Sequence, residues 1–244
     1  MKYRHTLYAC LLLTMITLQS RAEGIVVVTE DSSYAYLRDG MLTGPGTQVV
    51  ERVLATAVLD DYRIQLYPWA RAYEMALHEP NVLIYPIIRN AEREPFFKWV
   101  GEITQANTWL YRLREQSDIN PHSLDEARPY SVGVARGDIR HLYLQGKGFK
   151  RLVVSTTKRD SFQKLLKHQI QLLPMSEREA RLLSSEAQVD FALLEAVGTM
   201  DDIPASICMA FSLDTPDDIV ARARAAFEQL KASGEVDRLM KEIR

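Results

Sequence analysis

The chain has 244 residues, of which 47% are hydrophobic and 25% are charged, and its formal net charge is −2. A chain of this length and apolar content can bury the core of one large domain or of two small ones. The slightly acidic balance lacks the excess of positive charge that nucleic-acid-binding proteins use, so we expect no nucleic-acid partner.

Residues 1–22 have the pattern of a secretory signal peptide. Lys2 and Arg4 give a basic start, residues 6–18 are mostly apolar, and Ser20-Arg21-Ala22 places small residues around a cut before Glu23. The apolar run is far shorter than the ~20 residues that span a bilayer. We therefore expect a periplasmic protein, released through this signal peptide, with a mature chain of 222 residues (244 − 22).

Strands and helices alternate in the part of the chain that follows. Hydrophobic periodicity and turn residues predict a strand, a helix, a strand, a helix and a strand, over residues 25–29, 49–58, 63–66, 69–78 and 82–88. A turn that carries Arg93 comes next. This βαβαβ order predicts an open α/β sheet, and such sheets bind ligands at the carboxyl ends of their strands.

The alternation starts again at Thr108 and continues almost to the end of the chain. We expect strands over residues 109–113, 131–135, 152–155, 189–194 and 207–211. We expect helices over residues 138–145 and 160–168, after the capping box Ser176-Glu177-Arg178-Glu179, and after Thr215-Pro216-Asp217-Asp218. Gly234 is expected to separate two C-terminal helices.

The expected mature chain is mildly acidic and has one cysteine. Removal of residues 1–22 leaves 27 basic residues (30 − 3) against 32 acidic ones, a formal charge of −5 (27 − 32), and Cys208 as the only cysteine. One cysteine allows no intramolecular disulfide.

The titratable residues give no pattern typical of catalysis. The histidines lie in separate segments, without the spacing of a metal site. We expect no enzymatic activity, no cofactor and no metal.

Two motifs between residues 67 and 103 resemble a known family. They are Pro68-Trp69-Ala70-Arg71-Ala72 and Glu92-Arg93-Glu94-Pro95-Phe96-Phe97-Lys98-Trp99-Val100-Gly101. Together with residues 207–234, they resemble the solute-binding protein family 3 of bacterial transporters, the periplasmic amino-acid-binding type.

The resemblance implies an α/β fold of two lobes, the type II periplasmic-binding-protein-like fold. Each lobe is then a mixed sheet flanked by helices, and a two-strand hinge joins the lobes. The implied boundaries are 23–102 plus 207–244 for lobe one, 108–202 for lobe two, and 103–107 with 203–206 for the hinge.

The resemblance also implies two charged ligand contacts. Arg93 is matched to the residue that holds the ligand carboxylate, since a planar guanidinium forms two parallel hydrogen bonds. Glu195 closes the pattern Val189-Asp190-Phe191-Ala192-Leu193-Leu194-Glu195 and is matched to the acid that accepts hydrogen bonds from the ligand ammonium. The residues alone leave two alternatives open: a surface pair of Arg93 with a neighbouring glutamate, and a solvated Glu195.

Aromatic and acidic residues complete the expected pocket. The resemblance matches Glu30 to an acidic position of the cleft and Trp69 to an aromatic wall. Tyr34 and Tyr36 match aromatic positions approximately, and their flat rings suit stacking on a ligand or a cation. The alternative for an aromatic residue at a helix start is core packing.

Two segments depart from the family's pattern. Pro86-Ile87-Ile88 stands where amino-acid binders have Gly-x-Thr, which removes a hydroxyl and a backbone donor. We expect Ile88 to line the pocket and Tyr85 to fill part of it. In lobe two, Ala135-Arg136-Gly137-Asp138 lacks the expected Lys/Ser pattern, but Arg136 and the helix start at Asp138 suit an anionic group. The ligand is expected to keep a carboxylate without being a standard amino acid.

Two functions follow as hypotheses. The first is a periplasmic solute-binding protein that captures a small carboxylate-bearing ligand, an amino acid or a related polar metabolite, by hinge closure for an ABC transporter. The alternative is a periplasmic sensory or interaction protein on the same scaffold, with altered or lost small-ligand binding. The expected partners are the ligand and an ABC permease or a membrane sensor, and we expect a monomer.

Overall fold

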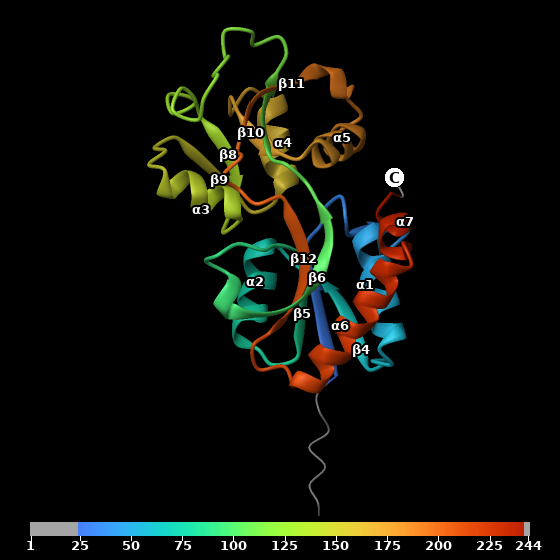
Figure 1. Ribbon diagram of the computed structural model, residues 1–244. Helices are drawn as coiled ribbons and strands as arrows, with labels where there is room; N and C mark the ends of the chain where they lie inside the picture. The colour runs from blue at the N-terminus through green and yellow to red at the C-terminus, as the bar shows by residue number, and fades with distance from the viewer. Residues whose placement is uncertain (1–23, 242–244) are drawn as a thin grey trace, which may run out of the picture.

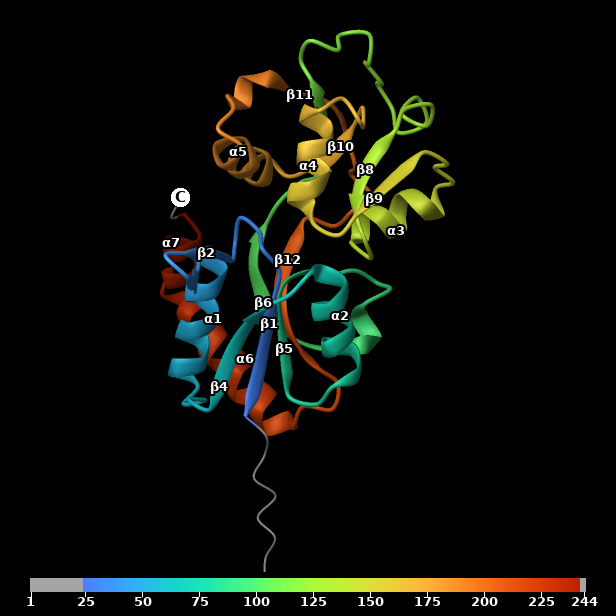
Figure 2. The same cartoon turned by 180° about the vertical axis from the view of Figure 1, so that it is seen from behind.

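The computed structural model describes residues 24–241, and the expected signal peptide at 1–22 lies outside them. Two lobes lie one above the other, and two strands, β6 (Phe97–Gln105) and β12 (Ser206–Ser212), run from one toward the other (Figures 1 and 2). The predicted two-lobed α/β architecture is confirmed. Within the described range, no helix combines the length and hydrophobicity of a membrane span.

Lobe one is built on a five-stranded mixed sheet, ordered β4-β1-β5-β12-β6. Its parallel strands are β1 (Ile25–Thr29), β4 (Tyr62–Leu66) and β5 (Val82–Ile88), and β12 runs antiparallel to β5 and β6. The chain passes from β1 to β4 on one side and then to β5 on the other. The carboxyl ends of β1 and β5 therefore flank a switch point, where open α/β sheets bind ligands.

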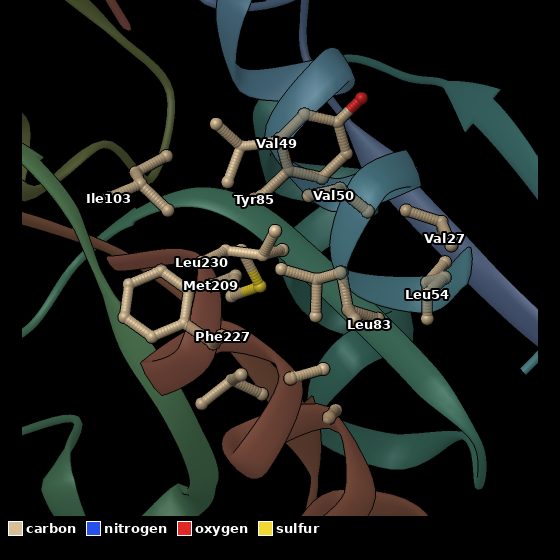
Figure 3. Packing of buried hydrophobic residues seen from close by; sticks show 14 of the residues in the cluster. Val27, Val49, Val50, Leu54, Leu83, Tyr85, Ile103, Met209, Phe227 and Leu230 are labelled. Carbon is tan, nitrogen blue, oxygen red and sulfur yellow. The ribbon is translucent and has the colours of Figure 1, made fainter. Parts of the chain in front are cut away.

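Helices cover both faces of this sheet. On one face lie α1 (Pro45–Thr56), α6 (Asp217–Ala232) and α7 (Glu235–Lys241), and on the other lies α2 (Trp69–His78). Figure 3 shows the first of these cores, in which Leu83, Met209 and Phe227 from three different elements meet. Each such side chain contributes roughly 1.5–3 kcal/mol when fully buried. The hairpin of β2 (Tyr36–Arg38) and β3 (Met41–Thr43) precedes α1.

Lobe two holds two smaller sheets. One is the antiparallel sheet β10-β7-β11, formed by Leu173–Met175, Trp109–Leu113 and Leu194–Thr199. The other pairs β8 (Val132–Ala135) with β9 (Leu152–Ser155) in parallel. Helices α3 (Ile139–Gly146), α4 (Lys158–Leu166) and α5 (Glu177–Glu186) each begin after a side chain that accepts a backbone hydrogen bond: Asp138, Thr157 and Ser176.

The two crossings between the lobes pair with each other. Ser206 lies opposite Gln105 in the β6–β12 ladder, and the Ala106 amide donates to the Ala205 carbonyl at 2.9 Å. The hinge segments expected from the sequence, 103–107 and 203–206, fall on this paired region. Bending about them stays a prediction.

One predicted strand is wrong. Residues 191–193 form the short 3-10 helix η2 (Phe191–Leu193), and the strand begins at Leu194, where the sequence pattern placed its end. The cause is local: the Asp190 carboxylate accepts a hydrogen bond from the Ala192 amide at 2.8 Å and so stabilises a turn in place of an extended chain.

Candidate ligand-binding site between the lobes

A small cavity lies between the lobes, beside the carboxyl ends of β1 and β5. Its volume is about 50 Å³, whereas pockets for drug-sized ligands hold roughly 300–1,000 Å³. Lobe one lines it with charged and aromatic residues that include Glu30, Tyr34, Trp69, Ile88 and Arg93. Lobe two lines it with polar residues that include Asp138, Arg140, Lys158, Ser176 and Glu179.

Arg93 forms part of the lobe-one wall and is 5% exposed. Its Nη1 donates to the Ile88 carbonyl at 3.0 Å, and its guanidinium lies 5.3 Å from the ring centroid of Trp69 and 5.0 Å from that of Tyr73. The surface pair with Glu94 is not formed, because Glu94 binds Arg89 at 2.6 Å. Within residues 24–241, no carboxylate lies inside the 4.0 Å ion-pair distance of Arg93. The guanidinium keeps donors for an anion.

Five charged side chains, four of them buried and Lys158 partly buried, form an ion cluster at the cavity. Lys158 Nζ lies 2.7 Å from Glu30, 3.6 Å from Glu179 and 3.9 Å from Asp138. Arg140 lies 3.4 Å from Glu179 and 3.7 Å from Asp138. Only Glu30 comes from lobe one, so the ion pair between Lys158 and Glu30 crosses the cleft.

Burial and charge act against each other in this cluster. Burial raises the pKa of the Glu30 carboxyl, although Lys158 lowers it. Burial also opposes ionisation of Asp138, but Arg140 and Lys158 outweigh it and hold the pKa of that carboxyl below its ordinary value. Burial lowers the pKa of the Lys158 ammonium, and the carboxylates of Glu30 and Glu179 more than reverse this, so its pKa is raised. Lys158 is therefore a permanent cation in the cleft.

Further contacts join the lobes around the cavity. Trp69 Nε1 donates to the Gly137 carbonyl at 2.9 Å, and Arg159 pairs with Asp31 at 2.7 Å. Each contact has one partner in each lobe. The structure is therefore a closed arrangement, held by the protein's own groups.

Five of the residues expected from the sequence come together at this cavity: Arg93, Trp69, Glu30, Tyr34 and Ile88. Ile88 ends β5, and the other four residues follow the ends of β1, β4 and β5 within a few residues, at one edge of the sheet. Among them, Arg93 has no acidic partner within ion-pair distance among the described residues, and Glu30 belongs to the ion cluster described above.

Glu195 is not brought to the cavity, which corrects its predicted place opposite Arg93. It is the second residue of β11, and β11 begins at Leu194, so Glu195 lies at the start of the strand and not at its end. Its carboxylate pairs with Arg112 at 2.9 Å and lies 3.8 Å from Arg114. These two arginines of its own lobe already neutralise it.

Tyr85, Tyr36 and Arg136 also lie outside the cavity. Tyr85 points into the lobe-one core (Figure 3), whereas Pro86 lines the cavity. The Tyr85 hydroxyl lies 2.9 Å from that of Thr47. Tyr36 lines a separate recess of about 620 Å³ between lobe one and α5. Arg136 is exposed and does not line the cavity.

Sequence reasoning did not identify the lobe-two residues of the site, Lys158, Arg140 and Glu179. The motif starting at Ser176 predicted a helix start, and the Ser176 hydroxyl does accept from the Glu179 amide at 3.2 Å. The Glu179 side chain instead faces the ion cluster. Its neighbours Ala180 and Leu183 are buried, so helical spacing places Glu179 on the inner face and was the available indication.

Solved structures with binding-protein folds match this chain over most of its length. A histidine kinase sensor domain with similarity to periplasmic binding proteins matches with a TM-score of 0.77 and 17% identity, over 90% of this chain and 96% of that chain. The amino acid ABC transporter substrate-binding protein AbpA from Streptococcus pneumoniae, bound to L-arginine, matches with a TM-score of 0.77 and 16% identity, over 90% and 93%.

A third similar structure is the arginine-, lysine-, histidine-binding protein ArtJ from Geobacillus stearothermophilus. Its TM-score is 0.74 at 16% identity, over 89% of this chain and 94% of that chain. No protein-family model and no curated protein sequence matches the chain. Identities this low establish the fold alone, and the chain has the fold of the periplasmic binding proteins.

Proposed function

We propose that this protein is an extracytoplasmic receptor that captures a small carboxylate-bearing ligand between its lobes. The observation that carries the proposal is Arg93, a buried guanidinium that faces the interlobe cavity and pairs with no carboxylate of residues 24–241. A buried cation is stabilised by an anionic partner, and a carboxylate matches the guanidinium with two charge-assisted hydrogen bonds. The secretory pattern of residues 1–22 supports a place outside the cytoplasm.

Capture is coupled to closure of the lobes. Arg93 belongs to lobe one, whereas Arg140 and Lys158 belong to lobe two, so a ligand that contacts both walls binds the closed form more tightly. Such a ligand shifts the population toward the closed form. The likeness to amino acid ABC transporter substrate-binding proteins supports delivery of the ligand to an ABC permease as the purpose of capture.

A sensory role on the same scaffold is the second candidate function. It is favoured by the likeness to a histidine kinase sensor domain. It is also favoured by the ion pair of Lys158 with Glu30, which joins the lobes through the protein's own side chains across a cavity of about 50 Å³. In this role a membrane sensor would recognise the closed lobes. The genes beside this one, encoding a permease and ATPase or a sensor, would discriminate the two roles.

Thermal unfolding in the presence of small carboxylates and amino acids tests the proposal. A ligand that binds only the folded protein stabilises it by about 2.7 kcal/mol at one hundred times its Kd. We expect a gain with at least one carboxylate, and we expect Arg93→Gln to weaken binding by at least roughly 100-fold, because two charge-assisted hydrogen bonds of about 1.5–3 kcal/mol each are lost. Arg93→Lys should restore only part of the affinity.

Arg89→Gln is the matched control, because Arg89 is an arginine of the same turn that pairs with Glu94 outside the cavity. It should keep the full ligand-induced gain. An unchanged gain in Arg93→Gln would show that Arg93 is not the ligand contact. The absence of any gain across the panel would favour the role without small-ligand binding.

A further inference from the structure

Three carboxylates in the cleft converge on a single ammonium group. Lys158 Nζ lies 2.7 Å, 3.6 Å and 3.9 Å from Glu30, Glu179 and Asp138, and the Lys158 side chain is 18% exposed. Several acidic oxygens around one buried point are what a protein needs to hold an ammonium ion. In this chain the ammonium is supplied by the protein itself, from the first residue of α4.

Lys158 stays with its site when the lobes separate. Glu179 and Asp138 belong to the same lobe as Lys158, and only Glu30 lies across the cleft. Arg140 neutralises the same two lobe-two acids, at 3.4 Å and 3.7 Å. A second ammonium entering this site would therefore meet two cations, and would find acids that are already paired. Like charges at short range in a buried site oppose binding.

On the lobe-one wall, by contrast, a cation has no acidic partner within ion-pair distance in the described part of the chain. Arg93 is 5% exposed, lines the same cavity and lies within ion-pair distance of no carboxylate of residues 24–241. Arg93 therefore has no carboxylate within ion-pair distance among the described residues, whereas each of the three acids lies within that distance of Lys158. Its volume of about 50 Å³ has room for a few water-sized groups, which favours a small ligand.

We infer that Lys158 determines specificity: its ammonium takes the place of a ligand ammonium, so the cleft selects small carboxylates that carry no amine over the corresponding amino acids. The inference rests on the proposed carboxylate-binding role of Arg93 and defines the ligand class of that site. Lys158 acts by occupying the acidic subsite and by excluding a second cation.

Matched pairs of ligands isolate the contribution of the amine. Propionate and L-alanine differ only by the α-ammonium group, as do succinate and L-aspartate. Titration calorimetry of the purified exported protein should show each carboxylate binding at least about tenfold more tightly than its amino acid, since the amine lacks acceptors and meets a like charge. Tighter binding of L-alanine and L-aspartate would overturn the inference.

Variants of Lys158 assign the preference to this residue. Lys158→Met leaves Glu30 without its cation and leaves Asp138 and Glu179 with Arg140 alone, and it should remove or reverse the preference. Lys158→Arg keeps the cation and should retain the preference. Lys164→Met is the matched control, because Lys164 lies on the same helix and its ammonium donates to the Ser155 hydroxyl outside the cavity. Circular dichroism establishes that each variant is folded. An unchanged preference in Lys158→Met would contradict the inference.

Arg93→Gln separates this inference from the proposed function. If amino acids bind better and Arg93→Gln weakens all four ligands, the role of Lys158 is wrong and the carboxylate site stands. If carboxylates bind better and Arg93→Gln weakens them, both are supported. If none of the four ligands binds the unmodified protein, both the proposed small-ligand site and the inference fall.

Discussion

Asp138 serves helix α3 and the ion cluster at the same time. Its Oδ1 accepts from the Arg140 amide at 2.9 Å, and its Oδ2 lies 3.7 Å from the Arg140 guanidinium. Burial opposes its ionisation, but Arg140 and Lys158 prevail and hold its pKa below the ordinary 3.8. A carboxyl whose pKa is lowered by folding contributes stability above its ordinary pKa, and this contribution is lost as the pH falls through the lowered value.

Asp138→Asn separates the two roles, because asparagine caps a helix as well as aspartate does but carries no charge. We expect the variant to lose about 1–3 kcal/mol of unfolding free energy at neutral pH. The difference from the unmodified protein should shrink in acid, below the ordinary pKa of 3.8. Urea unfolding of both proteins across this range measures it. A difference that stays constant with pH would contradict an electrostatic role, and Asp118→Asn, on an exposed loop, should have little effect at any pH.

The lobe-one residues of the site were more predictable than those of lobe two. Glu30, Ile88 and Arg93 follow or end strands whose bounds the apolar runs predicted correctly. Lys158 was not predictable in the same way, because its partner Glu30 lies 128 residues away in the sequence. A contact across the cleft depends on how two lobes meet, and no local pattern encodes it.

At the level of elements, β6 and α6 touch at a position without a side chain. A Cβ atom placed on Gly101 would overlap the ring of Phe227, which is 3% exposed in the lobe-one core (Figure 3). Glycine is therefore required for close contact of strand and helix, on the strand that leads into the hinge.

We expect Gly101→Ala to lower the unfolding free energy by about 1–3 kcal/mol, because the strand or the ring must move to make room. Gly146→Ala is the matched control: Gly146 ends α3, and nothing lies within 4 Å of its added Cβ. Alanine there should be neutral or stabilise by up to about 1 kcal/mol. Chemical denaturation of the two variants compares them, and equal losses would show that the contact with Phe227 is not the cause.

Element prediction succeeded for long apolar runs and failed for short or irregular strands. The helix over 69–78 and the strands over 82–88 and 109–113 have the predicted bounds. Strand β10 has three residues, lies at the edge of its sheet and includes Pro174, so it has neither the length nor the alternation that identifies a strand. Strand β6 was not predicted over its full length, and only residues 103–107 were expected to belong to a hinge.

At the level of the whole molecule, closure is supported by contacts that do not involve a ligand. The hydrogen bond of Trp69 Nε1 to the Gly137 carbonyl is one of them, at 2.9 Å. Trp69 also presents its ring to Arg93. A phenylalanine at this position keeps an aromatic face, removes the hydrogen bond between the lobes and makes the buried ring smaller.

We expect Trp69→Phe to lower the ratio of closed to open molecules about 2–10-fold, the range that corresponds to one hydrogen bond of about 0.5–1.5 kcal/mol. Small-angle X-ray scattering should then report a larger radius of gyration. Trp99→Phe is the matched control, since the indole of Trp99 donates at 3.4 Å to Glu94 within lobe one. Expansion of both variants, or of neither, would mean that the Trp69 bond does not govern closure.

Nuclear magnetic resonance of the Arg93 side chain tests the carboxylate site most directly. The Nε–H resonance of Arg93 can be identified by its disappearance in Arg93→Lys and followed during titration with propionate and with L-alanine. We expect this resonance to shift and to saturate with at least one of the two, as the guanidinium donates to the bound carboxylate. A resonance that stays in place while calorimetry detects binding would place the ligand elsewhere and contradict the assignment of Arg93.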